Sequence, residues 1–185
     1  MSLFSLSLEN IIVETIKFIE QHGLQALTDV LGIQIKTIEN ESFGNDLICL
    51  NYNQIESPKL HPVVKECRGL ILNKNTFDIV FRSMERFFNH NENGCVAKLD
   101  KDTDYFDKID GSYIKIYHFD GMWYLATRGT IFANNPVNPF GLTFKQLVYK
   151  ALGVENYDQF ALRAEANLDK TISYSFEITS PDNRV

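Results

Sequence analysis

A lysine, an aspartate and a glycine stand close together in the segment Lys108-Ile109-Asp110-Gly111-Ser112. The amine of such a lysine can attack a phosphorus atom once it has lost its proton. Asp110 can orient the amine, Gly111 lets a ligand approach the backbone closely, and Ser112 adds a hydrogen-bond donor and acceptor. A neutral amine near pH 7 requires a lowered pKa, so we expect Lys108 to be buried or to lie beside another positive charge. The alternative for so short a pattern is a chance string in a surface turn.

Four further segments with charged residues lie before and after the lysine segment in the sequence. They are Glu66-Cys67-Arg68-Gly69-Leu70, Met84-Glu85-Arg86-Phe87-Phe88-Asn89 with Glu92, Thr127-Arg128-Gly129-Thr130, and Phe176-Glu177 followed by Ser180-Pro181 and Asn183-Arg184-Val185. With the lysine segment they resemble, in order, the motifs of the covalent nucleotidyltransferase superfamily. The resemblance is greatest to the bacteriophage-type, tRNA-repair branch of ATP-dependent RNA ligases. One departure is Arg86, which stands where that branch more often has lysine. Five ordered matches are far more specific than any one of them.

The resemblance implies a reaction in three steps. Lys108 would attack the α-phosphorus of ATP, so that pyrophosphate leaves and lysyl-AMP forms. AMP would then pass to the 5′-phosphate of an RNA, and a 3′-hydroxyl would displace AMP and close the strand. The implied partner is RNA with 5′-phosphate and 3′-hydroxyl ends, and nicked tRNA is one candidate. Phosphoryl transfer needs neutralisation of developing charge, so Mg²⁺ is the implied metal, bound largely through phosphates and water, with no protein ligand assigned.

The resemblance also assigns roles to individual side chains. A planar guanidinium suits bidentate phosphate binding, so Arg68 would hold a phosphate of ATP, while Arg86 and Arg128 would add positive charge around the triphosphate. Glu177 would bind the ribose or a metal-bound water. Tyr52 stands at the distance upstream of Arg68 where the family has a nucleotide-contacting tyrosine. The expected nucleotide-binding residues are therefore Tyr52, Arg68, Arg86, Asp110, Gly111, Ser112, Arg128 and Glu177.

Each of these roles has an ordinary structural alternative. Arg68 would instead form a surface salt bridge, for example with Glu66. Glu177 would be a solvated carboxylate at the end of a strand, and Tyr52 would pack in the core. The phenylalanines Phe87, Phe88 and Phe176 are expected in the core rather than against a base, because buried aromatic rings are the commoner case.

Composition sets limits on the class of protein. The 185 residues suit one domain, and 44% hydrophobic residues suffice for a core. The net charge of −6 argues against a general nucleic-acid-coating protein. Residues 59–128 nevertheless contain 11 of the 18 lysines and arginines but only 10 of the 24 acidic residues, so a polyanion site is expected there. Three scattered cysteines and isolated histidines predict neither a disulfide framework nor a zinc site.

The elements that must position these residues can be read from periodicity and turn signals. Helices are expected from Leu8 to Ile19 with a stop at Gly23, from Gln25 to Leu31, from Thr143 to Leu152 behind a capping box, and around Asp158 to Asn167. Strands are expected at 33–38, 47–50, 69–72, 77–81 and 172–179, with a hairpin at 112–119 and 122–127. From Ile33 to Trp123 the sequence has the residue pattern of β-strands. The fold class is therefore α+β, an ATP-dependent ligase nucleotidyltransferase domain with antiparallel-rich sheets and N-terminal helices.

Two later motifs of the family are missing, a glutamate before glycine and apolar residues, and a Lys-x-Lys that contacts the phosphates. The family's C-terminal RNA-specificity domain is missing as well. We therefore expect residues 1–185 to be the N-terminal portion of an adenylyltransferase domain, incomplete at its C-terminus and with reduced activity or none on its own. The sequence leaves its oligomeric state and RNA substrate unknown. No membrane span or signal peptide is predicted, and the expected location is the cytoplasm, or the host cytoplasm for a viral protein.

Three other functions remain open at this stage. A DNA ligase and an mRNA capping guanylyltransferase share the lysine motif, although the segments around Arg68 and Arg86 favour an RNA ligase. A non-catalytic nucleotide- or RNA-binding remnant would keep the pocket without the chemistry. The missing Lys-x-Lys is the sequence feature that favours this alternative.

Overall fold

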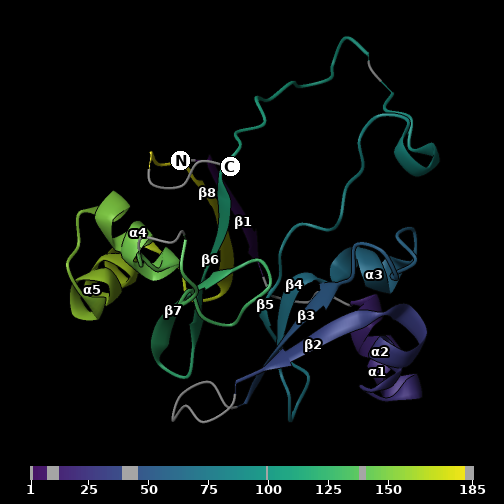
Figure 1. Cartoon of the computed structure of the whole chain (residues 1–185), viewed down its shortest axis with the longest axis horizontal. Coiled ribbons are helices and arrows are strands. Elements are labelled where there is room, and N and C mark those ends of the chain that lie inside the picture. Colours follow the sequence, from purple (N-terminus) through teal and green to yellow (C-terminus); the bar gives the residue numbers. More distant parts are fainter. Residues whose placement is uncertain (1, 8–12, 39–45, 99, 138–140, 182–185) are drawn as a thin grey trace.

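The computed structural model describes residues 2–7, 13–38, 46–98, 100–137 and 141–181 (Figure 1). Its helices are α1 (Glu14–His22), α2 (Ala26–Leu31), α3 (Pro62–Glu66), α4 (Phe144–Leu152) and α5 (Tyr157–Asn167), with a 3₁₀ turn at Glu92–Gly94. Its strands are β1 (Ser2–Ser7), β2 (Ile33–Thr37), β3 (Leu47–Tyr52), β4 (Arg68–Asn73), β5 (Ile79–Phe81), β6 (Ser112–Phe119), β7 (Met122–Thr127) and β8 (Ile172–Ile178). Each expected strand is present, although β5 begins at Ile79 rather than Phe77.

The strands form two sheets of four, in the orders β1-β8-β6-β7 and β2-β3-β4-β5. Every pairing between these described strands is antiparallel. Helices combined with wholly antiparallel sheets, without parallel βαβ units, agree with the expected α+β class.

The two sheets face each other, and helices cover their outer faces (Figure 1). Between the sheets lies an apolar cluster that includes Cys49, Ile71, Phe81, Tyr117 and Ala126. A second cluster joins α1, α2 and α3 to the sheet of β2 to β5, and a third joins α4 and α5 to the other sheet. The order of layers is therefore helix, sheet, sheet, helix, and any site built from both sheets lies where their ends meet.

The hairpin and the last helices form as their local signals predict. Asp120 and Gly121 both have positive φ, at 46° and 76°, as a tight two-residue turn between β6 and β7 requires. Thr143 and Gln146 make the reciprocal hydrogen bonds of a capping box at the start of α4. Gly153 ends this helix in the left-handed region.

The N-terminal helix is held by a buried carboxylate from elsewhere in the chain. Glu66 accepts hydrogen bonds from the backbone N–H groups of Glu14 and Thr15, at 3.1 and 2.8 Å, and from the Thr15 hydroxyl at 2.7 Å. These donors belong to the first turn of α1, where N–H groups lack intrahelical partners. Glu66 therefore joins α1 to α3, and the alternative in which it forms a salt bridge with Arg68 is wrong.

Three features differ from the sequence-based expectations. The first helix begins at Glu14, and the expected positions Leu8, Ile11 and Ile12 lie outside the described residues. Ser2–Ser7 form an unpredicted strand that pairs with β8. Pro62–Glu66 form a helix inside the stretch with expected β texture, because proline suits the first helical turn.

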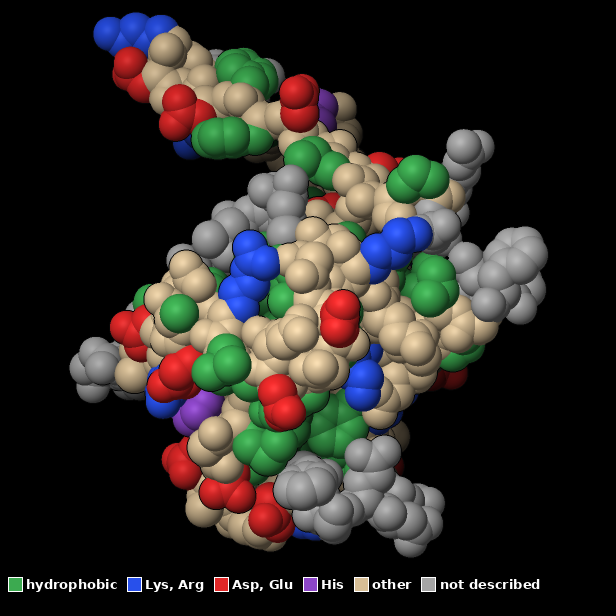
Figure 2. Space-filling view, turned by 90° about the vertical axis from the view of Figure 1, so that its left-hand side faces the viewer, with side chains coloured by type: hydrophobic (Ala, Val, Ile, Leu, Met, Phe, Trp, Pro, Cys, Tyr) green, Lys and Arg blue, Asp and Glu red, His purple; other side chains and the backbone are tan. Residues whose placement is uncertain are grey.

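A further difference concerns the chain between β5 and β6. Within residues 82–98 and 100–111 the regular structure is one 3₁₀ turn, and the segment extends away from the body of the molecule (Figure 1). Figure 2 shows it projecting at the top, with hydrophobic side chains among acidic and basic ones. Tyr105 and Phe106 on this segment are 74% and 88% exposed. The strand-like pattern expected up to Trp123 is therefore not realised within these residues.

The expectations on cysteines and membrane spans can be compared with the structure directly. Cys49, Cys67 and Cys95 are free thiols, as their spacing predicts. Burial raises the pKa of the Cys67 thiol to about 12, so this thiol is unreactive at neutral pH. Among the described helices none is long and apolar enough to cross a membrane.

Candidate active site

A pocket of about 500 Å³ opens where the two sheets meet. Six of the nine predicted site residues line it, namely Arg68, Lys108, Gly111, Ser112, Arg128 and Glu177. They come from β4, from the approach to β6, from the end of β7 and from β8. Nucleotide-sized ligands occupy clefts of roughly 300–1,000 Å³, so the pocket has the required size. Its three cations all come from the middle segment, residues 59–128, where a polyanion site is expected.

Beside the pocket, β4 and the end of β7 approach each other very closely. A Cβ atom added to Gly69 would lie 2.1 Å from the carbonyl oxygen of Arg128, which is far inside van der Waals contact. Gly69 also has a φ of +84°, where a side chain is strained. Only glycine fits here, and the contact brings together the two chain segments that carry Arg68 and Arg128.

Arg68 is held by two aromatic rings. Its Cζ atom lies 5.2 Å from the ring centre of Phe87 and 5.3 Å from that of Tyr113. Its Nη1 atom is buried and has no hydrogen-bond partner among the described residues. A buried guanidinium nitrogen without an acceptor is costly, so an anion in the pocket would satisfy it.

Lys108 lies at the mouth of the pocket. Its Nζ atom is 3.2 Å from Oδ1 of Asp110, and the two side chains are 77% and 72% exposed. Lys108 precedes β6, which begins at Ser112, so the amine is carried on an extended approach to the strand rather than on the strand itself. Of the two conditions expected for Lys108, burial or a neighbouring positive charge, burial is not met in this structure. An exposed ion pair contributes little to stability and is easily exchanged for other partners.

Gly111 and Glu177 meet at the junction of β6 and β8. A Cβ atom on Gly111 would lie 2.4 Å from the carbonyl oxygen of Ile178, so a side chain is excluded here too. The Glu177 carboxylate is half-buried, and burial raises its pKa although the Gly111 backbone hydrogen bond and the charges of Lys108 and Arg68 act to lower it. A half-buried carboxylate that lines a pocket does not match the alternative of a solvated strand end.

Tyr52, Arg86 and Asp110 are not among the residues that line this pocket. Arg86 lies with its Cζ atom 4.7 Å from the ring centre of Tyr52 and 5.1 Å from that of Phe88. It also pairs with Glu92 at 3.5 Å. Tyr52 is 5% exposed, so its ring packs in the core and against Arg86. Asp110 points to Lys108 from just outside the pocket lining.

Several residues at or near the pocket were not predicted from the sequence. Tyr113 and Phe87 enclose Arg68, yet Phe87 was expected in the core and is 61% exposed. Lys115 is fully buried between the sheets, where its Nζ atom donates to the Gly69 carbonyl. A signal for Lys115 does exist, because it shares the period-2 face of Tyr113 and Tyr117 in β6.

Comparison with known proteins bears on these residues directly. Residues 66–185 match the profile of a protein family described as RNA ligase. The matched range contains the lysine segment and every pocket residue named above. The chain belongs to this RNA ligase family. The family assignment confirms the resemblance inferred from the five ordered segments.

The chain is also similar to a longer viral protein. It is a protein of Autographa californica nuclear polyhedrosis virus assigned as a bifunctional polynucleotide kinase/RNA ligase, and it is 38% identical over 174 residues. That match covers 88% of this chain and 24% of the relative, so the chain spans about a quarter of the relative's length.

The described part of the chain has no ready-made metal site. No group of three or more histidine, cysteine or acidic residues there is arranged to hold a metal ion. Glu177 is the carboxylate that lines the pocket, and Asp110 lies beside Lys108. This donor set fits a magnesium ion that is held mainly by phosphate oxygens and water.

Proposed function

We propose that this chain forms the nucleotide-binding and lysyl-AMP-forming part of an ATP-dependent RNA ligase, with a nucleotidyltransferase fold. The observation that carries the proposal is the convergence of Arg68, Lys108, Arg128 and Glu177, which are far apart in sequence, on one pocket of about 500 Å³. The ligated strand would offer 5′-phosphate and 3′-hydroxyl ends, and nicked tRNA is a candidate. Cytoplasmic action, in the host for a viral protein, agrees with three free cysteines.

The first step joins Lys108 to AMP. The unprotonated Nζ atom attacks the α-phosphorus of ATP, the N–P bond forms, and the bond from phosphorus to the pyrophosphate oxygen breaks as the amine proton leaves. For this the amine must leave Asp110, and the exposure of the pair makes that exchange cheap. Arg68 and Arg128 supply fixed positive charge to the phosphates as negative charge moves onto pyrophosphate.

The remaining side chains orient the nucleotide. Glu177 accepts a hydrogen bond from the ribose or from a metal-bound water, since its carboxylate lines the same pocket as the amine. Gly111 and Ser112 allow close approach of the ligand to the start of β6. Mg²⁺, when bound, neutralises phosphate charge. Tyr52 and Arg86 reach the nucleotide only if their packed cluster rearranges.

Transfer of label from α-³²P-ATP to the protein, read on a denaturing gel, tests the proposal. We expect labelling that Lys108→Ala abolishes and that Lys101→Ala, an exposed lysine on the same segment, leaves intact. Rates are expected to be low in the 185-residue chain and higher when the two later motifs are present, because each well-placed donor contributes ~10²–10³ in rate at such sites.

The outcomes separate the competing functions. Labelling by GTP in preference to ATP would indicate a capping guanylyltransferase, and joining of nicked DNA but not RNA would indicate a DNA ligase. Binding of ATP without any labelled protein, in both the short and the extended chain, would indicate a non-catalytic remnant. Labelling that survives Lys108→Ala would overturn the nucleophile.

A further inference from the structure

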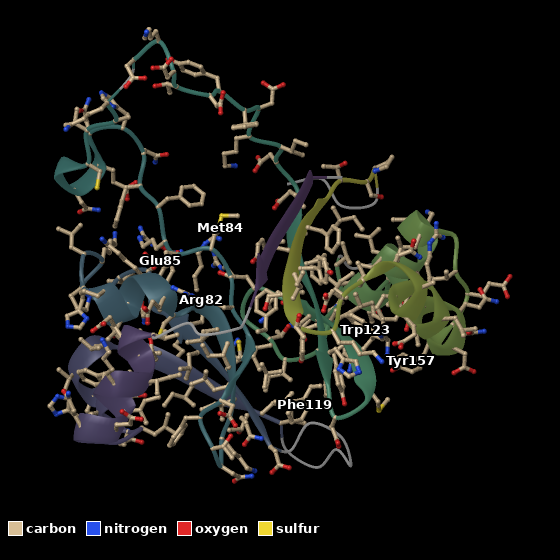
Figure 3. The ribbon with its side chains drawn as sticks, turned by 180° about the vertical axis from the view of Figure 1, so that it is seen from behind. Arg82, Met84, Glu85, Phe119, Trp123 and Tyr157 are labelled. Carbon is tan, nitrogen blue, oxygen red and sulfur yellow. The ribbon has the colours of Figure 1, made fainter. Side chains whose placement is uncertain are left out.

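A second cavity, of about 160 Å³, lies at the outer end of the β6–β7 hairpin and has no part in the nucleotide pocket. Six aromatic residues line it, namely Trp123, Tyr124, Phe132, Tyr149, Tyr157 and Phe160. Figure 3 shows Trp123 and Tyr157 near one another, one on β7 and the other at the start of α5, with Phe119 apart from both. We call this space the aromatic cavity.

The rings of the aromatic cavity come in two groups. On the strand side, Tyr124 and Phe132 stack with ring centres 5.5 Å apart and planes 22° apart, and Tyr117 continues the stack inward at 5.4 Å from Tyr124. On the helix side, Phe160 contacts Tyr149 at 5.8 Å and Tyr157 at 6.3 Å. Protein interiors leave few voids larger than a water molecule, so an open space between aromatic groups is suited to a flat ligand.

The polar residues at the cavity restrict the kind of ligand. Asn134 and Lys145 line it and are exposed, and no carboxylate is among its described lining residues. Asn134 offers both a donor and an acceptor to the edge of a ring, and Lys145 offers a positive charge to a neighbouring phosphate. A flat ring, a polar edge and an adjacent negative charge together describe a nucleotide in a single strand.

The aromatic cavity and the nucleotide pocket are built on the same two elements. Along β7, Tyr124 and Leu125 line the cavity, whereas Thr127 and the following Arg128 line the pocket. At the start of α4, Phe144 lines the pocket and the next residue, Lys145, lines the cavity. Strand residues rise ~3.3 Å each, so the four steps from Tyr124 to Arg128 span roughly 13 Å. That separation is within the reach of one short strand of RNA.

We propose that the aromatic cavity binds a nucleobase of the single-stranded RNA substrate, a few nucleotides from the end that reacts in the nucleotide pocket. This inference rests on the proposed function, because that function supplies the RNA. Stacking tolerates every base, so the cavity would anchor the strand without selecting its sequence. The anchor would give the chain affinity for RNA despite its net charge of −6.

The test measures binding of a fluorescein-labelled, 5′-phosphorylated 12-nucleotide RNA by anisotropy. Phe132 and Tyr157 are half-buried, so Phe132→Ala and Tyr157→Ala are chosen to remove one ring from each group. Each is expected to weaken binding roughly 5- to 150-fold, the range for loss of one base–aromatic stack. Phe132→Trp and Tyr157→Phe keep a ring and should restore binding. Phe119→Ala, which removes a half-buried ring of the same hairpin outside the cavity, should not weaken it.

An abasic series identifies the bound base. Replacing one nucleotide at a time by an abasic residue should reveal one or two positions where the wild-type chain loses affinity and Phe132→Ala loses no more. Lys145→Ala should lower the slope of log K against log salt by about 0.7, as expected for one phosphate contact in a single strand. Equal binding by wild type and both alanine variants would overturn the proposal. So would an abasic series in which, at every position, the loss of affinity adds to the loss caused by Phe132→Ala.

Two measurements, RNA binding and labelling of Lys108, distinguish failure of this inference from failure of the proposed function. Labelling of Lys108 by α-³²P-ATP should be unchanged in Phe132→Ala and Tyr157→Ala, because neither residue lines the nucleotide pocket. No labelling in any chain, with RNA binding that depends on the rings, would sink the enzymatic proposal alone. Normal labelling together with RNA binding that does not depend on the rings would overturn the proposal for the aromatic cavity. The cavity would then be a site for an apolar side chain of another protein segment.

Discussion

The Nζ atom of Lys115 donates a hydrogen bond to the carbonyl oxygen of Gly69 at 3.1 Å, across the interface between the two sheets. The lysine is fully buried and lies 3.7 Å from the Cys49 sulfur and 5.3 Å from the ring centre of Phe81. Gly69 follows Arg68 and packs against the backbone of Arg128. A buried amine is thus tied to the junction that positions both pocket arginines.

The buried amine makes the free energy of unfolding vary with pH in the alkaline range. Burial lowers the pKa of Lys115 below its ordinary value of 10.5, and the charge of Lys36 acts in the same direction. Between the folded pKa and 10.5 the unfolded chain therefore binds more protons than the folded chain, so the free energy of unfolding rises with pH in that window. We expect Lys115→Met to reduce this rise, measured by urea unfolding between pH 7 and pH 10.

Lys74→Met is the matched control, because Lys74 is an exposed lysine whose removal leaves the buried amine in place. Its pH dependence of stability should equal that of the wild type. An unchanged slope in Lys115→Met would show that the lysine is hydrated in solution and that burial does not shift its titration.

The approach of β4 to Arg128 predicts a large effect of a single methyl group. Gly69→Ala places a Cβ atom 2.1 Å from the Arg128 carbonyl oxygen at a φ of +84°. Gly121→Ala imposes a similar φ of +76° in the hairpin turn, with no atom within 4 Å. Positive φ costs a non-glycine residue ~1–2 kcal/mol, and a forced backbone shift adds ~1–3 kcal/mol. We expect Gly121→Ala to lose only the first amount and Gly69→Ala both, by chemical denaturation.

Labelling adds a second measurement to this pair. Gly69→Ala separates Arg68 from Arg128, so lysyl-AMP formation should fall even at temperatures where the variant is folded. Gly121→Ala should label like the wild type. Equal stability losses in the two variants would mean that the junction opens without strain.

The buried carboxylate of Glu66 predicts a stability loss without a loss of chemistry. Glu66→Gln keeps one acceptor oxygen but replaces the other by an amide that cannot accept from the α1 backbone or from Thr15. Loss of a buried, charge-assisted hydrogen bond costs roughly 1–3 kcal/mol. We expect a loss of that size for Glu66→Gln and none for Glu56→Gln, an exposed glutamate in the loop after β3. Unfolding followed by circular dichroism measures both, and equal stabilities would contradict the cap.

Local sequence signals predicted most of the elements, and these are the elements whose boundaries are set locally. The turn at Asp120-Gly121, the capping box at Thr143 and the glycine stop at Gly153 need no tertiary context. The strand Ser2–Ser7 was missed because it is defined by pairing with β8, more than 160 residues away along the chain. Sequence alone carries no information on such a partner.

The candidate site divides in a similar way. Ordered motifs included six of the residues that line the pocket, but they could not tell that Tyr52 and Arg86 pack together outside its lining. Nor could they place Lys115, whose charge predicts solvent while its strand position predicts the interior. Long-range packing decided each of these cases.

The stacking of Phe87 on Arg68 gives the last prediction. Phe87 is 61% exposed and its ring lies 5.2 Å from the guanidinium carbon, so its removal should loosen Arg68 without unfolding the chain. A cation–π contact at an exposed site contributes ~0.5–1 kcal/mol, which corresponds to a two- to five-fold loss of ATP affinity in Phe87→Ala by equilibrium dialysis. Phe106→Ala removes a more exposed ring of the same segment, away from Arg68, and should leave affinity unchanged. Equal losses in both variants would point to a general effect of the segment's aromatic residues, and no loss in either would show that Tyr113 alone holds the guanidinium.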